Sequence, residues 1–178
     1  MIVNLKNPKT DSYQELKNII LGTTFPWFFE QSSTHGDNMG YNNSPFLSHV
    51  VLRRPLGDNK YPKVRSPEYV DLFEKVLSEI WDYNDININS ILRINLNITL
   101  PSSDKRSTVP HTDHEFKHQN TLIYLTDAGG KTFINAFPGQ EDEVADPKED
   151  DAVVFDGEVH CYMLPEKCRR IVLVATHI

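Results

Sequence analysis

The sequence lacks a long apolar run, and this shortage excludes a helical membrane span. No stretch approaches the roughly 20 consecutive apolar residues that a helix needs to cross a bilayer. Residues 1–6 also lack the apolar core of a secretory signal peptide. We therefore expect a cytoplasmic protein with no membrane partner.

Cysteine and positive charge are also scarce. Cys161 and Cys168 are too few for a disulfide framework, so we expect both to remain thiols and Cys161 to serve in packing. Lys and Arg number 18 against 25 Asp and Glu, which gives a net charge of -7. Because this overall field repels phosphates, extended binding to duplex nucleic acid is disfavoured. The basic pair Lys105-Arg106 is expected to lie at a solvated loop tip.

Two stretches in the first half have the period of an amphipathic helix. In residues 10–21 the apolar side chains recur at helical intervals, with Asp11 or Ser12 available as the N-cap. Residues 68–83 carry a second apolar stripe, preceded by Ser66-Pro67 at a plausible N-cap and first helical position. We expect these helices to pack on a sheet.

From residue 91 the pattern changes to the period of two that is typical of strands. Residues 91–100 alternate apolar and polar side chains, and further β-rich runs follow at 121–125, 131–136, 152–155 and 171–175. An earlier strand is predicted at 46–53. The aromatic run 25–29 is expected to pack in the core beneath the first helix.

Many short strands separated by turns predict a mainly β protein with flanking helices. The expected architecture is a double-stranded β-helix (jelly-roll) core with the N-terminal helices packed on one face. At 178 residues the chain is expected to form a single domain. Residues 1–90 would be a helical and strand scaffold, and residues 91–178 would be the jelly-roll core that carries the functional site.

Metal-ligand residue types stand at a suggestive spacing in the second half. If residues 109–113 are extended, His111 and Asp113 point to the same face, because side chains two apart on a strand do so. His160 follows 47 residues later (160 minus 113), far enough for the chain to return to the same rim. Two imidazoles and one carboxylate with an open opposite face suit non-heme Fe(II). A set that uses His114 is disfavoured, because residues three apart on a strand point to opposite faces, and the nearby His118 is a further alternative.

A basic pair enters the last predicted strand about ten residues after His160. Arg169 and Arg170 are neighbours, so only one of them can face the inside of a sheet. An arginine at this place can hold the far carboxylate of an anionic co-substrate through two parallel hydrogen bonds, which a lysine does less specifically.

An ordered set of segments in the second half resembles a known family. The segments are Pro110-His111-Thr112-Asp113, residues 120–125 leading into Gly129-Gly130-Lys131-Thr132, Phe155-Asp156-Gly157 before His160, and residues 169–173. Together they resemble the Fe(II)/2-oxoglutarate-dependent dioxygenases. The resemblance is to the prolyl 4-hydroxylase-like branch, in particular its small stand-alone members from bacteriophages, and it covers roughly residues 93–174.

The resemblance implies an iron site and an oxidative reaction. It implies that His111, Asp113 and His160 bind Fe(II), and that 2-oxoglutarate and O2 are converted to succinate and CO2 while a second substrate is hydroxylated. A peptidyl prolyl residue is one candidate substrate, beside a nucleotide or a small metabolite. A phage-encoded protein of this kind would act in the host cytoplasm.

The resemblance also implies how 2-oxoglutarate is held. Arg170 is favoured over Arg169 as the residue that binds the C5 carboxylate, and Tyr124 would donate a hydrogen bond to the same group. Asn97 and Thr132 would line the co-substrate pocket.

Two rival functions use the same donor set. One is a non-catalytic, cupin-like barrel in which His111, Asp113 and His160 hold a structural or sensory ion, and the other is a hydrolytic zinc site. Neither explains an arginine at position 170. Residues 31–45 and 101–109 are expected to contact the primary substrate, because they precede strands that should carry the site.

Overall fold

The alternating segment at the centre of the sequence forms the middle of a large antiparallel sheet. The computed structural model describes residues 1–31, 45–56, 60–135 and 143–178. In it β5 (Ile91–Thr99) pairs with β11 (Arg170–His177) on one side and with β3 (Phe46–Arg53) on the other. The sheet order is β1-β9-β6-β11-β5-β3-β2, and β4 also pairs with β3. The remaining strands of this sheet are β1 (Val3–Leu5), β2 (Phe28–Glu30), β4 (Lys63–Val64), β6 (Gln119–Tyr124) and β9 (Ala152–Asp156).

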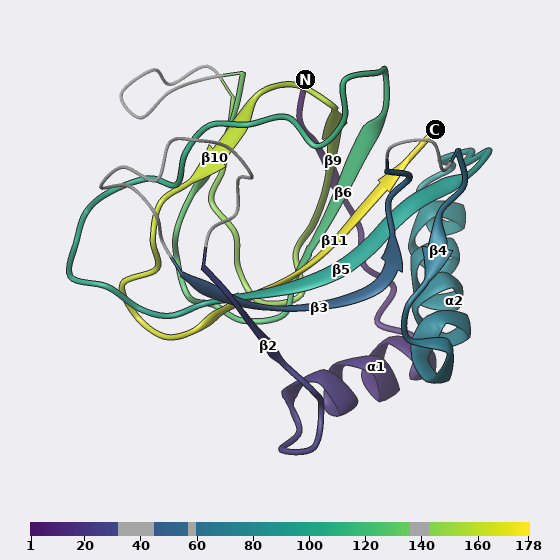
Figure 1. The fold of residues 1–178 in the computed structure, drawn as a ribbon, viewed down its shortest axis with the longest axis horizontal. Helices are drawn as coiled ribbons and strands as arrows, with labels where there is room; N and C mark the ends of the chain where they lie inside the picture. The colour runs from purple at the N-terminus through teal and green to yellow at the C-terminus, as the bar shows by residue number, and fades with distance from the viewer. Residues whose placement is uncertain (32–44, 57–59, 136–142) are drawn as a thin grey trace.

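A small second sheet faces the inner side of the large one (Figure 1). Its order is β10-β7-β8, with β7 at Thr132–Ile134, β8 at Val144–Ala145 and β10 at His160–Tyr162. Apolar side chains from both sheets fill the space between them, namely Leu122, Tyr124, Ile134, Ala145, Val153, Phe155 and Val172. Two curved antiparallel sheets packed in this way confirm the predicted jelly-roll core.

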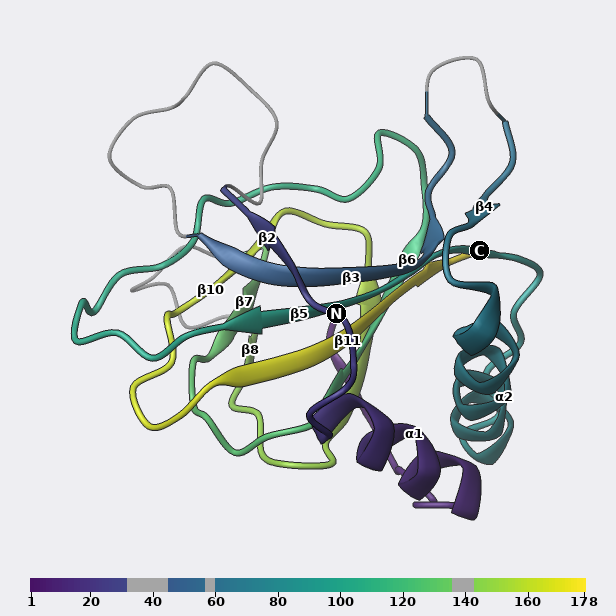
Figure 2. The same ribbon diagram turned by 60° about the horizontal axis from the view of Figure 1, so that its bottom comes forward.

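Both predicted helices are present, and they cover the outer face of the large sheet (Figure 2). They are α1 (Asp11–Leu21) and α2 (Pro67–Tyr83). The alternation of β5 explains the layers, because Ile94, Leu96 and Ile98 join the helix-facing core while the intervening polar residues face the small sheet. The N-cap of α1 is Thr10, which accepts a hydrogen bond from the Tyr13 N–H at 3.2 Å, so the prediction of Asp11 or Ser12 was wrong by one or two residues.

The aromatic run 25–29 lies only partly in the core. Phe25 is buried against Trp27, His49 and Tyr69. Phe28 and Phe29 lie on the edge strand β2 with 59% and 70% of their surface exposed, so the expectation of core packing is wrong for them. Cys161 is buried beside Phe133, which confirms its packing role. No helix among the described residues is long and apolar enough to cross a membrane.

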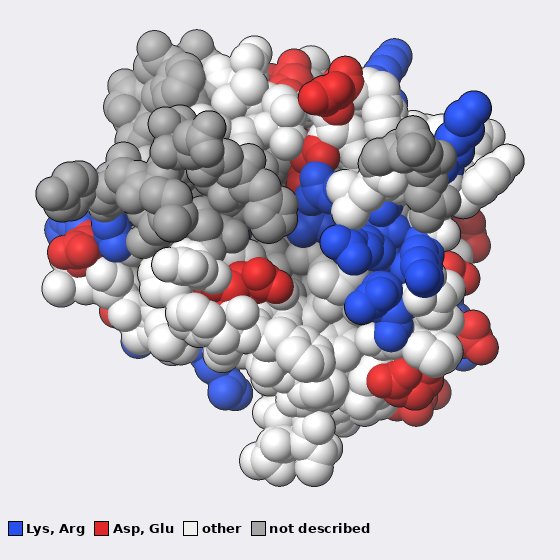
Figure 3. Space-filling model, viewed as in Figure 1, with Lys and Arg blue, Asp and Glu red and all other residues white. Residues whose placement is uncertain are grey.

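Positive charge gathers on one side of the molecule. Figure 3 shows Lys and Arg side chains together over β3 and β4. The residues there are Arg53 at the end of β3, Lys63 directly opposite it on β4, and the exposed Arg65 that follows β4. Arg53 is separated in the sequence from Lys63 and Arg65, so the pairing of β3 with β4 is needed to bring these three together.

Candidate metal centre and co-substrate pocket

Strand pairing brings the two histidines of the predicted metal site side by side. The segment that precedes Asp113 runs along β10, with bridges from Ser107 to Met163 and from His111 to His160. His111 and His160 exchange both backbone hydrogen bonds, at 3.0 and 2.9 Å. Side chains of such a directly opposed pair lie on the same face, and here the ring centroids are 4.7 Å apart.

Both imidazoles are oriented by backbone carbonyl groups. His111 Nδ1 lies 3.0 Å from the Val109 oxygen, and His160 Nδ1 lies 2.9 Å from the Glu158 oxygen. Because a carbonyl oxygen can only accept, each Nδ1 carries the hydrogen and each Nε2 is left with its lone pair. Burial lowers the pKa of His160, although the nearby Asp113 carboxylate acts to raise it. The lowered pKa favours this neutral form. Fixing the tautomer through the other ring nitrogen is how proteins prepare a histidine for a metal.

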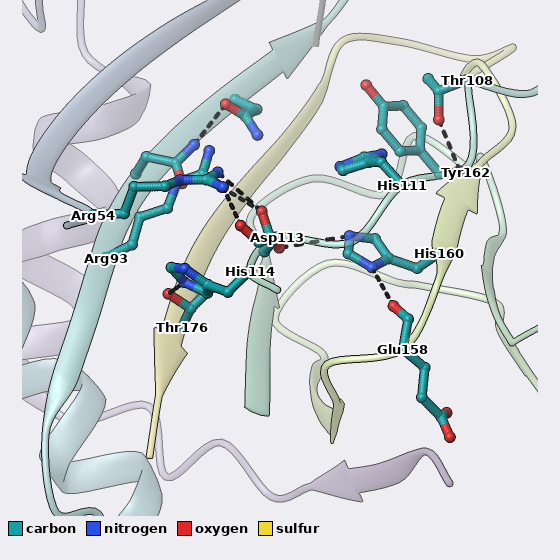
Figure 4. Close-up of polar contacts among 12 residues, drawn as sticks. Arg54, Arg93, Thr108, His111, Asp113, His114, Glu158, His160, Tyr162 and Thr176 are labelled. Atoms are coloured by element: carbon teal, nitrogen blue, oxygen red, sulfur yellow. Dashed lines mark hydrogen bonds and ion pairs between the residues drawn. The ribbon is translucent and has the colours of Figure 1, made fainter. Parts of the chain in front are cut away.

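Asp113 is held by two arginines (Figure 4). Its side chain is 3% exposed, and Oδ1 accepts hydrogen bonds from Arg93 at 2.5 Å and from Arg54 at 3.1 Å. Arg54 also donates to the Asp113 backbone oxygen. The other carboxylate oxygen, Oδ2, faces His160 Nε2 at 3.6 Å. One oxygen is therefore engaged, while the second is directed toward the histidines.

The electrostatics of this group keep Asp113 ionised. Burial alone would raise its pKa, but Arg93, His160 and Arg54 hold that pKa well below its usual range. Burial lowers the pKa of Arg93 to about 10, so its guanidinium is still charged at neutral pH. Asp113 thus combines a full negative charge with one oxygen that is not engaged by an arginine.

The donors approach one another without forming a complete ligand cage. Within residues 1–31, 45–56, 60–135 and 143–178, no group of three or more His, Cys, Asp or Glu side chains is already gathered tightly enough to hold a metal ion. His111, Asp113 and His160 nevertheless share one side of the interior, and each has a donor atom left over from its hydrogen bonds. The chemistry of the set, two neutral imidazoles and one carboxylate, fits a divalent ion with open positions.

The other histidines have different surroundings. His114 Nε2 is hydrogen-bonded to Thr176 at 2.8 Å, and its ring stacks on Phe116, so this atom is not available as a ligand. The ring of His118 meets the edge of His114 at a centroid distance of 4.6 Å. His177 lies on the outer face, where its Nε2 contacts Thr121 at 2.8 Å.

A second group of predicted residues surrounds a buried cation. Arg170, which is 5% exposed, begins β11, and one of its terminal nitrogens donates to Thr132 Oγ1 at 3.0 Å. The same Thr132 oxygen lies 2.9 Å from the Tyr124 hydroxyl, whose pKa is raised by burial. The Arg170 guanidinium lies over the Tyr162 ring at 4.2 Å from its centroid. Arg169 is exposed.

The positive charge of Arg170 lacks a counterion in the described parts of the chain. It makes no ion pair there, and its Nε has no hydrogen-bond partner. An unpaired buried charge is costly, so such a residue is expected to meet an anion that is supplied from outside. Gly130 makes room beside it: a Cβ there would lie 3.3 Å from Arg170 Cδ and only 2.6 Å from the Met163 oxygen.

Asn97 lies on the same inner face but makes a different contact. It is half-buried on β5, opposite Val172 of β11, and its side-chain oxygen accepts a hydrogen bond from Asn95 at 2.8 Å. Asn97 therefore lies near the Arg170 group without touching the guanidinium through a hydrogen bond. The predicted residues Tyr124, Thr132 and Arg170 do form one contact group.

Three residues at these sites were missed by sequence reasoning. Tyr162 could have been found, because it stands two positions after His160 and shares its strand face. Arg93 also carries a signal, since it is the first polar residue on the inner face of the alternating strand β5. Arg54 lies beyond the end of β3, and nothing in its sequence context indicates that it reaches Asp113.

Comparisons with known proteins identify the fold. No family model and no curated protein matches the chain. Among solved structures, a 2OG-Fe(II) oxygenase family oxidoreductase from Burkholderia pseudomallei has a TM-score of 0.69 at 16% identity, over 98% of this chain and 84% of that one. A prolyl hydroxylase from Trichoplax adhaerens, in complex with a hypoxia inducible factor peptide fragment, has a TM-score of 0.58 at 13% identity, over 100% and 82%.

A third solved structure gives the same result. It is a non-heme alpha ketoglutarate dependent epimerase from nogalamycin biosynthesis, with a TM-score of 0.61 at 10% identity, over 99% of this chain and 78% of that one. At such identities the likeness concerns the fold. The chain thus has the fold of the 2OG-Fe(II) oxygenases, which confirms the predicted fold class.

Proposed function

We propose that the protein is an Fe(II)- and 2-oxoglutarate-dependent dioxygenase that hydroxylates a second substrate. In the overall reaction 2-oxoglutarate, O2 and a C–H bond give succinate, CO2 and a C–OH group. His111, Asp113 and His160 would hold the iron, and Arg170 would bind the distal carboxylate of 2-oxoglutarate. The fold shared with oxygenases supports this reaction class.

The observation that carries the proposal is the buried guanidinium of Arg170, which lies beside the candidate metal ligands and has no ion pair among the described residues. Tyr162, whose ring contacts this guanidinium, stands two residues after His160 on β10, so the two groups share one strand face. A cupin-like barrel that only stores an ion has no use for a buried carboxylate receptor next to it. A dicarboxylate that chelates the ion at one end and meets Arg170 at the other satisfies both groups.

The protein's own residues would prepare the reaction in distinct ways. The two imidazoles present lone pairs at Nε2, and Asp113 is kept ionised and is held at Oδ1 by Arg93 and Arg54. This leaves Oδ2 as a single oxygen donor, so that positions on the ion remain for co-substrate and O2. Bound iron would supply the activation of O2 for both oxidations.

The pocket around Arg170 would orient 2-oxoglutarate. Tyr124 stays protonated because burial raises its pKa, so its hydroxyl can donate to the same carboxylate. Thr132 contacts both residues and holds them in position, and Asn97 would line the pocket from β5. Leu122 and Val172 are buried between the sheets and would limit access of water to the reacting groups.

A peptidyl prolyl residue is the candidate substrate that the resemblance suggests. The prolyl hydroxylase from Trichoplax adhaerens, which shares the fold, was solved with a peptide fragment. Of the two segments expected to contact the substrate, residues 31–45 lie outside the described residues except for their two ends. The segment 101–109 runs along β10 toward His111, so it remains a candidate for this contact.

The experiment measures succinate formation from 2-oxoglutarate with Fe(II) and ascorbate, with and without each proposed ligand. His111→Ala, Asp113→Ala and His160→Ala should each abolish succinate formation, because each removes an ion ligand. Titration with Co(II), followed by visible absorption, should show weakened binding in the same variants. Full turnover in any of the variants would remove the assignment, and metal binding without any 2-oxoglutarate conversion would favour the cupin-like alternative.

A further inference from the structure

The cations over β3 and β4 have no acidic partners among the described residues, unlike several cations on the rest of the surface. Arg53, Lys63 and Arg65 are exposed and make no ion pair within the described residues. Some lysines elsewhere are paired with carboxylates, namely Lys9, Lys17, Lys75, Lys131 and Lys167. Arg53 and Lys63 even stand directly opposite each other, an arrangement of like charges that destabilises a strand pair. Because the chain has a net charge of -7, this local concentration of positive charge is suited to bind an anionic partner.

The cluster is connected to the candidate metal centre through neighbouring residues of the chain. Arg53 belongs to it, and the next residue, Arg54, is half-buried and donates hydrogen bonds to both the carboxylate and the backbone oxygen of Asp113. Arg93, the other arginine on Asp113, is on β5 beside the end of β3. The strand end that carries Arg53 is therefore also the one from which Arg54 reaches Asp113.

The geometry of β4 indicates which kind of anion fits. β4 pairs only with β3 among the described strands, so its other edge has backbone groups available to an added strand. Lys63 and Arg65 are two residues apart, which is roughly 7 Å along an extended chain. The carboxylates at alternate positions of an extended peptide have the same spacing, and arginine binds carboxylates through two parallel hydrogen bonds.

We propose that the second substrate is a peptide with Asp or Glu residues beside the residue that is oxidised, and that Arg53, Lys63 and Arg65 bind these carboxylates along the edge of β4. This inference rests on the proposed function, because it names the substrate class of that same site. A nucleic acid is less well matched, since the overall negative field opposes a partner that carries one charge per phosphate. The arginines of the cluster would fix where the acidic residues of the peptide bind. The edge of β4 would add backbone hydrogen bonds that do not depend on the sequence of the peptide.

The test measures binding of labelled peptides by fluorescence anisotropy in the presence of Mn(II) and 2-oxoglutarate. The probe is a fluorescein-labelled twelve-residue peptide of alternating Glu and Ala with a central Pro, and a Lys-for-Glu version and a twelve-nucleotide oligo(dT) are compared with it. The triple variant Arg53→Glu, Lys63→Glu, Arg65→Glu should bind the acidic peptide about threefold to 140-fold more weakly, since each of three exposed ion pairs contributes about 0.2–1 kcal/mol. Binding by the native protein should weaken as salt rises.

The matched control changes the net charge by the same amount elsewhere. The triple variant Lys6→Glu, Lys75→Glu, Lys167→Glu alters three exposed lysines outside the cluster and should bind the peptide like the native protein. Equal weakening in both triple variants, tighter binding of oligo(dT), or no measurable peptide binding would each overturn the proposal. Succinate formation without peptide, measured in parallel, should be unchanged in both variants. Its absence in the native protein would count against the proposed function, whereas peptide binding tests only the present inference.

Discussion

Replacing Arg170 by Met should separate the binding of 2-oxoglutarate from the stability of the protein. The guanidinium is 5% exposed, has no ion pair among the described residues, and keeps an unpartnered Nε. Truncating one partner of a buried, hydrogen-bonded charge pair costs about 2–5 kcal/mol of binding free energy. At about 1.4 kcal/mol for each factor of ten, the half-saturating concentration of 2-oxoglutarate should rise roughly 30-fold to 5000-fold.

The same substitution should leave the free energy of unfolding of the unliganded protein unchanged or raise it. Met has a similar length, and it removes a buried charge that no carboxylate of the described residues compensates. Tyr124→Phe should weaken 2-oxoglutarate binding by less, roughly tenfold to 150-fold, because it removes one hydrogen bond to a charged carboxylate, worth about 1.5–3 kcal/mol.

The assay combines initial rates of succinate formation with the shift in unfolding temperature caused by 2-oxoglutarate and Mn(II). Arg169→Met is the matched control, since Arg169 is exposed and adjacent in the chain, and it should behave like the native protein. If Arg169→Met raised the requirement for 2-oxoglutarate more than Arg170→Met, the two roles would be exchanged. If Arg170→Met bound 2-oxoglutarate as well as the native protein, the reasoning from the unpaired charge would be refuted.

Three further substitutions test the packing and electrostatics. Gly130→Ala should destabilise the fold by about 1–3 kcal/mol in urea unfolding, because φ is +79° and the added Cβ would meet the Met163 oxygen at 2.6 Å. An unchanged urea midpoint of unfolding would contradict this close approach. Burial opposes ionisation of Asp150, yet Lys17 and other donors lower its pKa from 3.8 to about 2. Ionised Asp150 therefore stabilises the protein above pH 3.8, and this stabilisation is lost as the pH falls to about 2. Asp150→Asn should therefore show a smaller loss of stability over that pH interval, and a loss equal to the native one would argue against the pairing. Phe73→Ala should lower the free energy of unfolding by about 3–5 kcal/mol, since Phe73 is fully buried between α2 and the large sheet. A decrease under about 1 kcal/mol in the same urea assay would place that residue outside the core.

Elements with a strong local period could be predicted from the sequence. The alternation in β5 indicates a strand whose two faces differ in polarity, and the apolar stripe of α2 indicates a helix on a sheet; both are confirmed with boundaries within a residue or two. The strands β2, β4, β8 and β10 have two or three residues each and carry no usable period. Their pairing is set by tertiary contacts, which local patterns do not encode.

The candidate site likewise combines residues that the sequence predicts with an arrangement that it does not predict. His111, Asp113 and His160 could be selected by residue type, but the register that sets His111 directly opposite His160 depends on the pairing of distant segments. Residues 109–113 were expected to be extended, and only His111 is bridged to a strand there, so Asp113 is positioned chiefly by Arg93 and Arg54. Arginines that approach a carboxylate from other strands leave no pattern in the sequence around it.

The proposed function requires that one divalent ion and one dicarboxylate occupy this interior together. An anaerobic crystal structure with Mn(II) and 2-oxoglutarate tests it most directly, with the ion located by anomalous scattering. We expect the ion at His111 Nε2, His160 Nε2 and one Asp113 oxygen, and the distal carboxylate of 2-oxoglutarate on Arg170. An ion bound elsewhere, or a 2-oxoglutarate molecule that makes no contact with Arg170, would contradict it.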